Sequence, residues 1–88
     1  MEYLLFSYPN CAKCESLKDS LNSRGIAYEE LDLTRKESKL RIREFLQVLK
    51  RDESGGIILP TLIIKENEGV KAVLNSREEF EQWWPSKV

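Results

Sequence analysis

The chain contains two cysteines, Cys11 and Cys14, in the stretch YPNCAKCES at residues 8–16. Two thiols separated by two residues can form a reversible disulfide, so the pair is a candidate for thiol–disulfide exchange. Two other interpretations compete with this one: half of a metal site, or two small side chains at the start of a helix. The composition and the surrounding elements bear on the choice.

A metal site is disfavoured by the ligands that the chain lacks. A structural zinc ion needs four ligands, and the sequence offers two cysteines and no histidine. A closed site would require carboxylates or a second subunit. The absence of histidine also excludes a Cys–His nucleophilic pair within the chain. A purely structural disulfide is disfavoured as well, because closing so short a loop constrains the unfolded chain very little.

Residues 12–24 are compatible with a helix, and Gly25 is well placed to end it. Cys11 would then lie at or just before the first turn, where unpaired backbone N–H groups and the helix dipole stabilise a thiolate. Lys13 adds a nearby cation. Both effects would lower the pKa of the Cys11 thiol and activate it as a nucleophile.

Cys14 shares one face of this helix with Leu17 and Leu21, at helical spacing. We therefore expect Cys14 to be more buried than Cys11. The two thiols would differ as exchange requires, because the exposed thiolate attacks a disulfide and the sheltered thiol resolves the mixed disulfide.

Apolar runs predict the strands that position this helix. The predicted strands are residues 2–8, 26–33, 59–66 and 70–74. A short turn, ENEG at 66–69, joins the last two strands and favours an antiparallel hairpin. Pro60 would lie near the start of its strand, where a residue without an N–H group is tolerated.

Two further helices are predicted, separated by a polar, glycine-rich loop at 51–56. The first runs from a capping box, Thr34 with Glu37, to about residue 50. Its apolar stripe is Leu40, Ile42, Phe45, Leu46 and Leu49. The second covers 76–84, begins at Ser76 with Glu79 three residues later, and ends at Pro85.

The predicted order is therefore β-α-β-α-β-β-α within one α/β domain, residues 1–88. Strands joined through a helix are parallel and strands in a tight hairpin are antiparallel, so we expect a mixed four-stranded sheet with helices on both faces. Trp83 and Trp84 would anchor the last helix to the core, with one of them partly exposed. The charged run 35–44 would be a solvated helix face.

The overall charge indicates neither nucleic acid nor a membrane as a partner. The net charge is −1, from 14 basic and 15 acidic residues spread along the chain. The longest apolar run, 55–64, is far shorter than the roughly 20 residues that span a bilayer. The opening residues do not have the pattern of a signal peptide, so the expected location is cytoplasmic.

The combined pattern resembles the glutaredoxins, which adopt the thioredoxin fold. The matching residues are Ser7, Pro9, Cys11 and Cys14 in a serine–x–proline–x–CxxC arrangement, followed by Pro60 in LPT. The resemblance implies a cis proline at Pro60 that faces the thiols. It also implies that the backbone of Leu59 pairs with bound substrate, strand to strand.

Three features depart from the usual glutaredoxin pattern. Tyr8 replaces the basic residue that binds a glutathione carboxylate, and the pair reads C-A-K-C. The glycine pair before the last helix is also missing, although Asn75, Ser76 and the helix N–H groups would be able to bind a carboxylate. Thioredoxins match less well, while relatives reduced by thioredoxin reductase and arsenate-reductase-like regulators remain alternatives.

The resemblance implies a monomeric thiol–disulfide oxidoreductase that reduces protein or small-molecule disulfides and needs no bound cofactor. Cys11 would be the nucleophile and Cys14 the resolving thiol. Substrate would contact the binding residues Tyr8, Pro9, Leu59, Pro60, Asn75 and Ser76. Electrons would come from glutathione, as a co-substrate, or from a thioredoxin reductase. The alternative is a non-enzymatic module that uses Cys11 to bind a partner or an iron–sulfur cluster shared by two subunits.

Overall fold

The computed structural model describes residues 1–67 and 69–84. Two details of the sequence predictions therefore lie outside the described residues: the helix end at Pro85 and the part of the predicted turn formed by Glu68.

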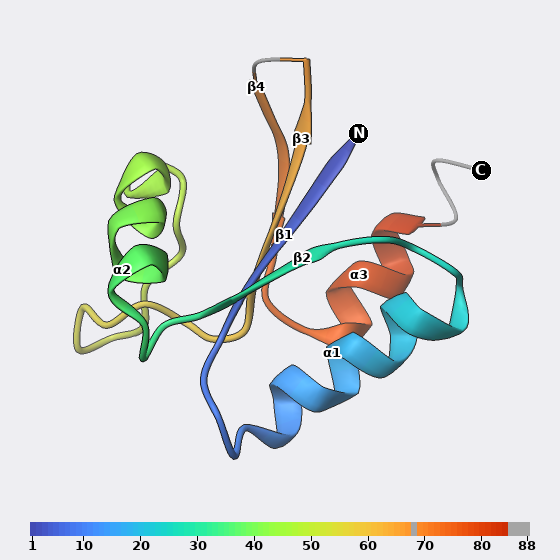
Figure 1. Cartoon of the computed structure of the whole chain (residues 1–88), viewed down its shortest axis with the longest axis horizontal. Coiled ribbons are helices and arrows are strands. Elements are labelled where there is room, and N and C mark those ends of the chain that lie inside the picture. Colours follow the sequence, from blue (N-terminus) through green and yellow to red (C-terminus); the bar gives the residue numbers. More distant parts are fainter. Residues whose placement is uncertain (68, 85–88) are drawn as a thin grey trace.

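Four strands form one mixed sheet. β1 (Glu2–Ser7) pairs in parallel with β2 (Glu29–Asp32) and antiparallel with β3 (Thr61–Glu66). β4 (Gly69–Leu74) pairs antiparallel with β3 and completes the order β2-β1-β3-β4 (Figure 1). The predicted mixed sheet and hairpin are confirmed.

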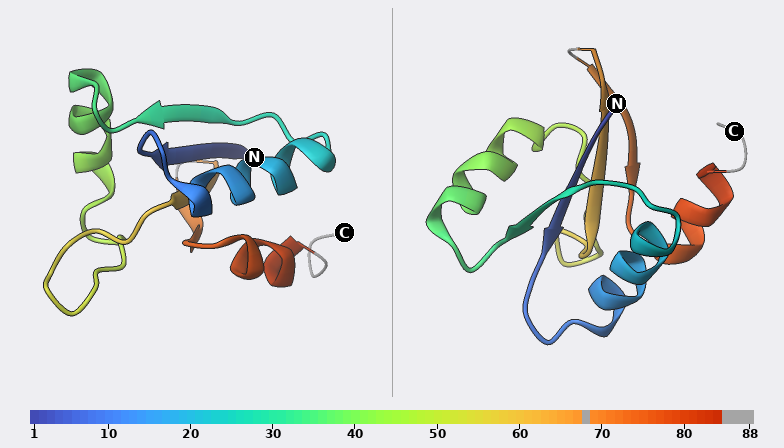
Figure 2. Two further views of the ribbon diagram at one scale, coloured as in Figure 1. Left: turned by 90° about the horizontal axis from the view of Figure 1, so that it is seen from below. Right: turned by 45° about the vertical axis from the view of Figure 1, so that its right-hand side comes forward.

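Helices cover both faces of this sheet. α1 (Ala12–Ser23) and α3 (Arg77–Trp83) lie together on one side of the strands, and α2 (Lys36–Ile42) lies on the other (Figures 1 and 2). No helix in the described part of the chain has both the length and the apolar character needed to cross a membrane.

The two inner strands supply apolar side chains to both faces because successive side chains of a strand point in opposite directions. The α2 side of the sheet packs a cluster that includes Leu4, Phe6, Ile63, Ile42, Phe45 and Leu49. The other side packs a cluster that includes Leu5, Leu62, Ile64, Leu17, Leu21 and Phe80. The two clusters hold the helices at fixed positions relative to the ends of β1 and β3.

The helix predicted for 34–50 is shorter, and its predicted apolar stripe is partly wrong. α2 ends at Ile42 and continues as a 3-10 turn, η1 (Arg43–Phe45). Leu40 and Leu46 are 53% and 43% exposed, whereas Ile42 is buried. Leu40 precedes Ile42 by two residues, which places it roughly 200° around the helix and away from the core.

The capping box predicted at Thr34 is also wrong. The Thr34 hydroxyl and N–H both donate to Asp32 Oδ1, at 2.7 and 2.8 Å. Arg35 occupies the N-cap position of α2 and makes no side-chain capping bond. Because the Thr34 hydroxyl is bonded to the Asp32 carboxylate, it does not cap the helix. Asp side chains often form such local hydrogen bonds in turns.

The second predicted strand is shorter than expected, since β2 starts at Glu29. Gly25, in the left-handed region with φ +68°, ends α1 as predicted, and the N–H of Ile26 returns to the carbonyl of Leu21 at 3.0 Å. This turn directs Ile26 and Tyr28 onto the α1 side of the core before pairing with β1 begins.

The start of α3 follows the predicted cap. Ser76 Oγ accepts from the N–H of Glu79 at 3.0 Å, and Glu79 Oε1 accepts from the N–H of Asn75 at 3.0 Å. The same carboxylate pairs with Lys50 Nζ at 3.1 Å. At the other end of the helix, Trp83 and Trp84 are both partly buried and both pack near Phe80.

The contrast between Ile42 and Leu40 gives a direct test of the assigned α2 face. Ile42→Ala should lower the free energy of unfolding by about 2–5 kcal/mol, because it leaves a cavity in the core. The control, Leu40→Ala, should change it by no more than about 0.5 kcal/mol. Denaturant unfolding followed by tryptophan fluorescence measures both values. Losses of similar size would contradict the assignment.

Glu79 should make stability depend on pH. Its burial opposes the charge, but the hydrogen bonds from Asn75 and Lys50 outweigh this effect and lower its pKa below the ordinary 4.5. A lowered folded-state pKa gives stability that is complete above 4.5 and is lost as the pH falls through the folded-state value.

We therefore expect the free energy of unfolding to fall more steeply for the wild type than for Glu79→Gln as the pH is lowered below 4.5. Denaturant titrations at a series of pH values provide the comparison. Parallel profiles for the two proteins would show that Glu79 does not contribute in this way.

Candidate active site

The sheet register brings two distant segments together. β1 ends at Ser7, β3 begins at Thr61, and Phe6 faces Thr61 in the antiparallel pair. The chain that leaves β1 toward Cys11 and the chain that enters β3 from Pro60 therefore lie at the same end of the sheet. This placement follows from the pairing of two apolar strands and needs no contact between the site residues themselves.

The loop after β1 positions Cys11 as the N-cap of α1. Tyr8, Pro9 and Asn10 are exposed, with Tyr8 44% exposed, and Asn10 adopts φ +58°. Asparagine tolerates this left-handed conformation better than most residues. The next residue, Cys11, is extended (φ −109°, ψ 107°), and the helix begins at Ala12.

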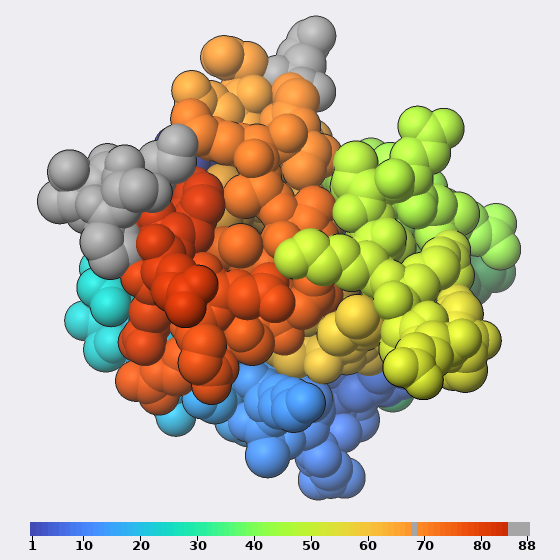
Figure 3. Space-filling model, turned by 180° about the vertical axis from the view of Figure 1, so that it is seen from behind, coloured from blue at the N-terminus to red at the C-terminus, as the bar shows by residue number. Residues whose placement is uncertain are grey.

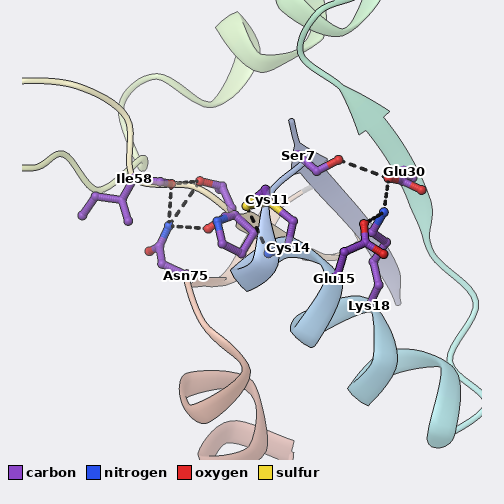
Figure 4. The surroundings of a disulfide bond; sticks show 10 residues. Ser7, Cys11, Cys14, Glu15, Lys18, Glu30, Ile58 and Asn75 are labelled. Atoms are coloured by element: carbon purple, nitrogen blue, oxygen red, sulfur yellow. Dashed lines mark hydrogen bonds and ion pairs between the residues drawn. A yellow bond between two sulfur atoms is a disulfide. The ribbon is translucent and has the colours of Figure 1, made fainter. Parts of the chain in front are cut away.

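The two sulfur atoms lie in different surroundings. Cys11 is partly exposed, while Cys14 is completely buried. A disulfide joins them, with the Cα atoms 5.2 Å apart. The N–H of Cys14 donates to Cys11 Sγ at 3.1 Å (Figure 4). The sulfur of Cys11 thus performs the capping role usually taken by a Ser, Thr, Asp or Asn oxygen.

The segment that enters β3 contains a cis peptide bond between Leu59 and Pro60. This agrees with the cis proline that the resemblance implied. Asn75, at the junction of β4 and α3, donates from Nδ2 to the carbonyls of Ile58 and Pro60, each at 3.0 Å. The turn is therefore fixed to the last strand–helix junction (Figure 4).

A cavity of about 250 Å³ lies where these segments meet. Its lining comes from α1, from the turn before β3 and from the start of α3: Lys13, Ser16, Ile58, Leu59, Asn75, Ser76, Arg77 and Glu78. Figure 3 shows these three parts side by side, with α1 in blue, the segment before β3 in yellow and α3 in orange-red. The cavity borders the first turns of the helix that Cys11 caps.

Most of the predicted site residues are brought to this end of the fold. Lys13, Leu59, Asn75 and Ser76 line one cavity. Lys13 is exposed, and among the described residues it forms no ion pair. The Asn75 side chain is only 6% exposed, and its amide N–H groups are used by the chain's own carbonyls.

Sequence reasoning missed a polar cluster on the other side of the disulfide (Figure 4). Lys18 Nζ lies 2.7 Å from a carboxylate oxygen of both Glu15 and Glu30, and Ser7 Oγ donates to Glu30 at 3.2 Å. The hydrogen bond to Glu15 is the largest cause of a raised pKa of Lys18, and the hydrogen bond to Glu30 is the next largest. The spacing of Glu15 and Lys18 was readable in the sequence. The contact with Glu30 depends on the parallel pairing of β1 and β2.

Within residues 1–67 and 69–84, no group of three or more Cys, His, Asp and Glu side chains is arranged to hold a metal ion.

Solved structures with similar folds agree with this architecture. Escherichia coli NrdH-redoxin, described as a glutaredoxin-like protein, is 16% identical with a TM-score of 0.60, over 88% of this chain and 84% of that one. The thioredoxin-like protein BC3987 is 20% identical with a TM-score of 0.63, over 92% and 96%. Thioredoxin-2 of the malaria parasite is 22% identical with a TM-score of 0.62, over 96% and 80%.

No curated protein sequence matches the chain. The family model for glutaredoxin, however, matches residues 4–69, which is more than half of the 88 residues and includes both cysteines and Pro60. The match agrees with the fold and with the position of the cysteine pair at the start of α1. The chain therefore belongs to the glutaredoxin family.

Proposed function

We propose that this protein is a thiol–disulfide oxidoreductase that reduces protein or small-molecule disulfides with its Cys11–Cys14 dithiol. The observation that carries the proposal is the asymmetry of the pair. Cys11 is the partly exposed N-cap of α1, and Cys14 is buried one turn further along. Family membership supports this chemistry as well.

The reaction proceeds in two exchanges. The Cys11 thiolate attacks one sulfur of a substrate disulfide, forms a mixed disulfide and expels the other sulfur as a thiolate, which takes up a proton. The Cys14 thiol loses its proton and attacks Cys11 Sγ, releasing the second substrate thiolate. The substrate gains two electrons and the protein is left with the Cys11–Cys14 disulfide, the bond present in the structure.

The position of Cys11 supports its role as the attacking group. A thiolate at the N-cap would accept the hydrogen bond that Cys14 N–H makes to Cys11 Sγ, and it would face the positive end of the helix dipole. These interactions favour the charged form and lower the pKa of a thiol from about 8.5. Lys13 would add a further cation, and a buried Cys14 would stay protonated until the mixed disulfide forms.

Substrate recognition is proposed for the loop with Tyr8 and Pro9 and for the turn with Leu59 and Pro60. Among the described residues, neither the N–H nor the carbonyl of Leu59 has a hydrogen-bond partner within the chain. A peptide beside the disulfide can pair with both groups as an added strand.

For the electron donor we favour a thioredoxin reductase over glutathione. Tyr8 replaces the basic residue usual in glutaredoxins, and the side-chain N–H groups of Asn75 are occupied within the chain. NrdH-redoxin, which is similar in fold, is a glutaredoxin-like protein with a thioredoxin-like activity profile. Either donor would keep the pair reduced in the cytoplasm, the location that we propose.

Serine variants test the roles of the two thiols. Cys11→Ser should abolish disulfide reduction, because the nucleophile is lost. Cys14→Ser should keep the first exchange and accumulate a mixed disulfide, since nothing resolves it. Release of the chromophoric thiol from 5,5′-dithiobis(2-nitrobenzoate) gives the rate, and intact mass gives the adduct. The proposal fails if Cys11→Ser reacts at the wild-type rate or if Cys14→Ser forms no adduct.

The donor is tested by reducing the oxidised protein. We expect a thioredoxin reductase with NADPH to reduce it at least about tenfold faster than glutathione at matched electron equivalents, a difference of about 1.4 kcal/mol in barrier. Thiol counting over time measures both rates. Faster reduction by glutathione would reverse the assignment of the donor but leave the dithiol mechanism intact.

A further inference from the structure

Asn75 makes a concentrated set of hydrogen bonds to the turn that contains the cis peptide bond. Its Nδ2 lies 3.0 Å from the carbonyl oxygens of Ile58 and Pro60 and 3.2 Å from Thr61 Oγ1. The Thr61 hydroxyl itself donates to the carbonyl of Ile58 at 2.6 Å. One side chain from the β4–α3 junction thus contacts three positions of a segment distant in sequence.

The chemistry of these partners fixes the orientation of the amide. Carbonyl oxygens only accept hydrogen bonds, so the NH2 group of Asn75 must face Ile58 and Pro60. The Asn75 Oδ1 atom is buried and has no partner among the described residues. Donation by Nδ2 is therefore the interaction by which this side chain holds the turn.

The backbone polar groups of residues 58–60 are all used except those of Leu59. The N–H of Ile58 donates to the carbonyl of Lys50 at 3.2 Å, and the carbonyls of Ile58 and Pro60 accept from Asn75. Pro60 has no N–H group. Within the part of the chain that the structure describes, the unpaired groups of this turn are thus the N–H and the carbonyl of Leu59.

A closed set of contacts supports Asn75 itself. Its backbone N–H donates to Glu79 at 3.0 Å, Glu79 pairs with Lys50 Nζ at 3.1 Å, and the carbonyl of Lys50 receives the N–H of Ile58. The Asn75 side chain donates to the carbonyl of the same Ile58, which closes the set. The turn is consequently held from both sides, with the Leu59 peptide groups left available.

We propose that Asn75 is a positioning residue for peptide substrates. It fixes the carbonyls on either side of Leu59 so that the N–H and carbonyl of Leu59 stand ready to pair with the strand that carries the substrate disulfide. The inference rests on the proposed function, and it gives Asn75 a role through Leu59 in place of direct contact with substrate. It also makes disulfides within extended peptides the preferred substrate class.

Two disulfide substrates, one with a peptide backbone and one without, distinguish a positioning role of Asn75 from a general structural role. The reduced protein is mixed with a peptide dimer joined by one disulfide, or with 5,5′-dithiobis(2-nitrobenzoate), which has no peptide backbone. Asn75→Ala should lower the second-order rate constant for the peptide disulfide by about tenfold or more and that for the aromatic disulfide by less than about twofold. Equal losses, or no loss, would overturn the proposal.

A nearly isosteric variant covers the case in which Asn75→Ala folds poorly. In Asn75→Asp a carboxylate replaces the amide donor, and burial beside two carbonyl oxygens raises the pKa of the new carboxyl. Protonation restores one donor. The rate of Asn75→Asp relative to wild type should therefore rise for the peptide disulfide as the pH is lowered from about 8 to about 5. A ratio that does not change with pH would count against positioning.

Ser20→Ala is the matched control. Ser20 is also buried, and its hydroxyl donates to Glu81 at 3.0 Å between α1 and α3, away from the cis turn. This variant should lose stability without changing the ratio of the two rate constants. A change as large as that of Asn75→Ala would indicate a general structural effect. If the wild type attacks neither disulfide, the proposed function itself fails, an outcome distinct from loss of the Asn75 effect alone.

Discussion

The hydrogen bond from the N–H of Cys14 to Cys11 Sγ is the interaction on which the rest of the site depends. It makes a sulfur atom the N-cap of α1, so in the reduced protein the backbone groups that begin the helix would also stabilise a negative charge on that sulfur. The same helix geometry turns Cys14 into the core beside Leu17 and Leu21. The start of α1 therefore gives the two cysteines different exposure, which is the basis of the different roles proposed for them.

The second half of the site, the Leu59–Pro60 turn, is placed by the pairing of strands that are distant in sequence. β1 and β3 are neighbours because both are apolar and occupy the centre of the sheet, and their antiparallel register sets the Leu59–Pro60 turn at the end of the sheet from which α1 starts. Asn75 and the pair of Lys50 and Glu79 then hold that turn from the β4–α3 side. The cysteine pair and the turn proposed to bind the substrate backbone thus come from different parts of the chain.

The sequence was most informative where one local interaction dominates. The apolar runs of β1 and β3, the glycine end of α1 and the Ser76 cap of α3 were predicted because propensity and burial agree there. The sequence predictions were wrong at Thr34, because its hydroxyl donates to Asp32, and at Leu40, because that residue lies on the opposite side of α2 from Ile42. They were also wrong at Leu46, because α2 ends at Ile42 and a 3-10 turn follows. The amide contacts of Asn75 and the link from Lys18 to Glu30 join segments far apart in sequence, so no local pattern could reveal them.

The central claim is that Cys11, and not Cys14, is the activated thiol. It is tested most directly by titrating the ultraviolet absorbance of thiolate in the reduced protein and in the two serine variants. We expect one thiol with a pKa below the ordinary value of about 8.5, retained in Cys14→Ser and lost in Cys11→Ser. A low pKa that follows Cys14, or two thiols that both titrate at or above about 8.5, would contradict the claim.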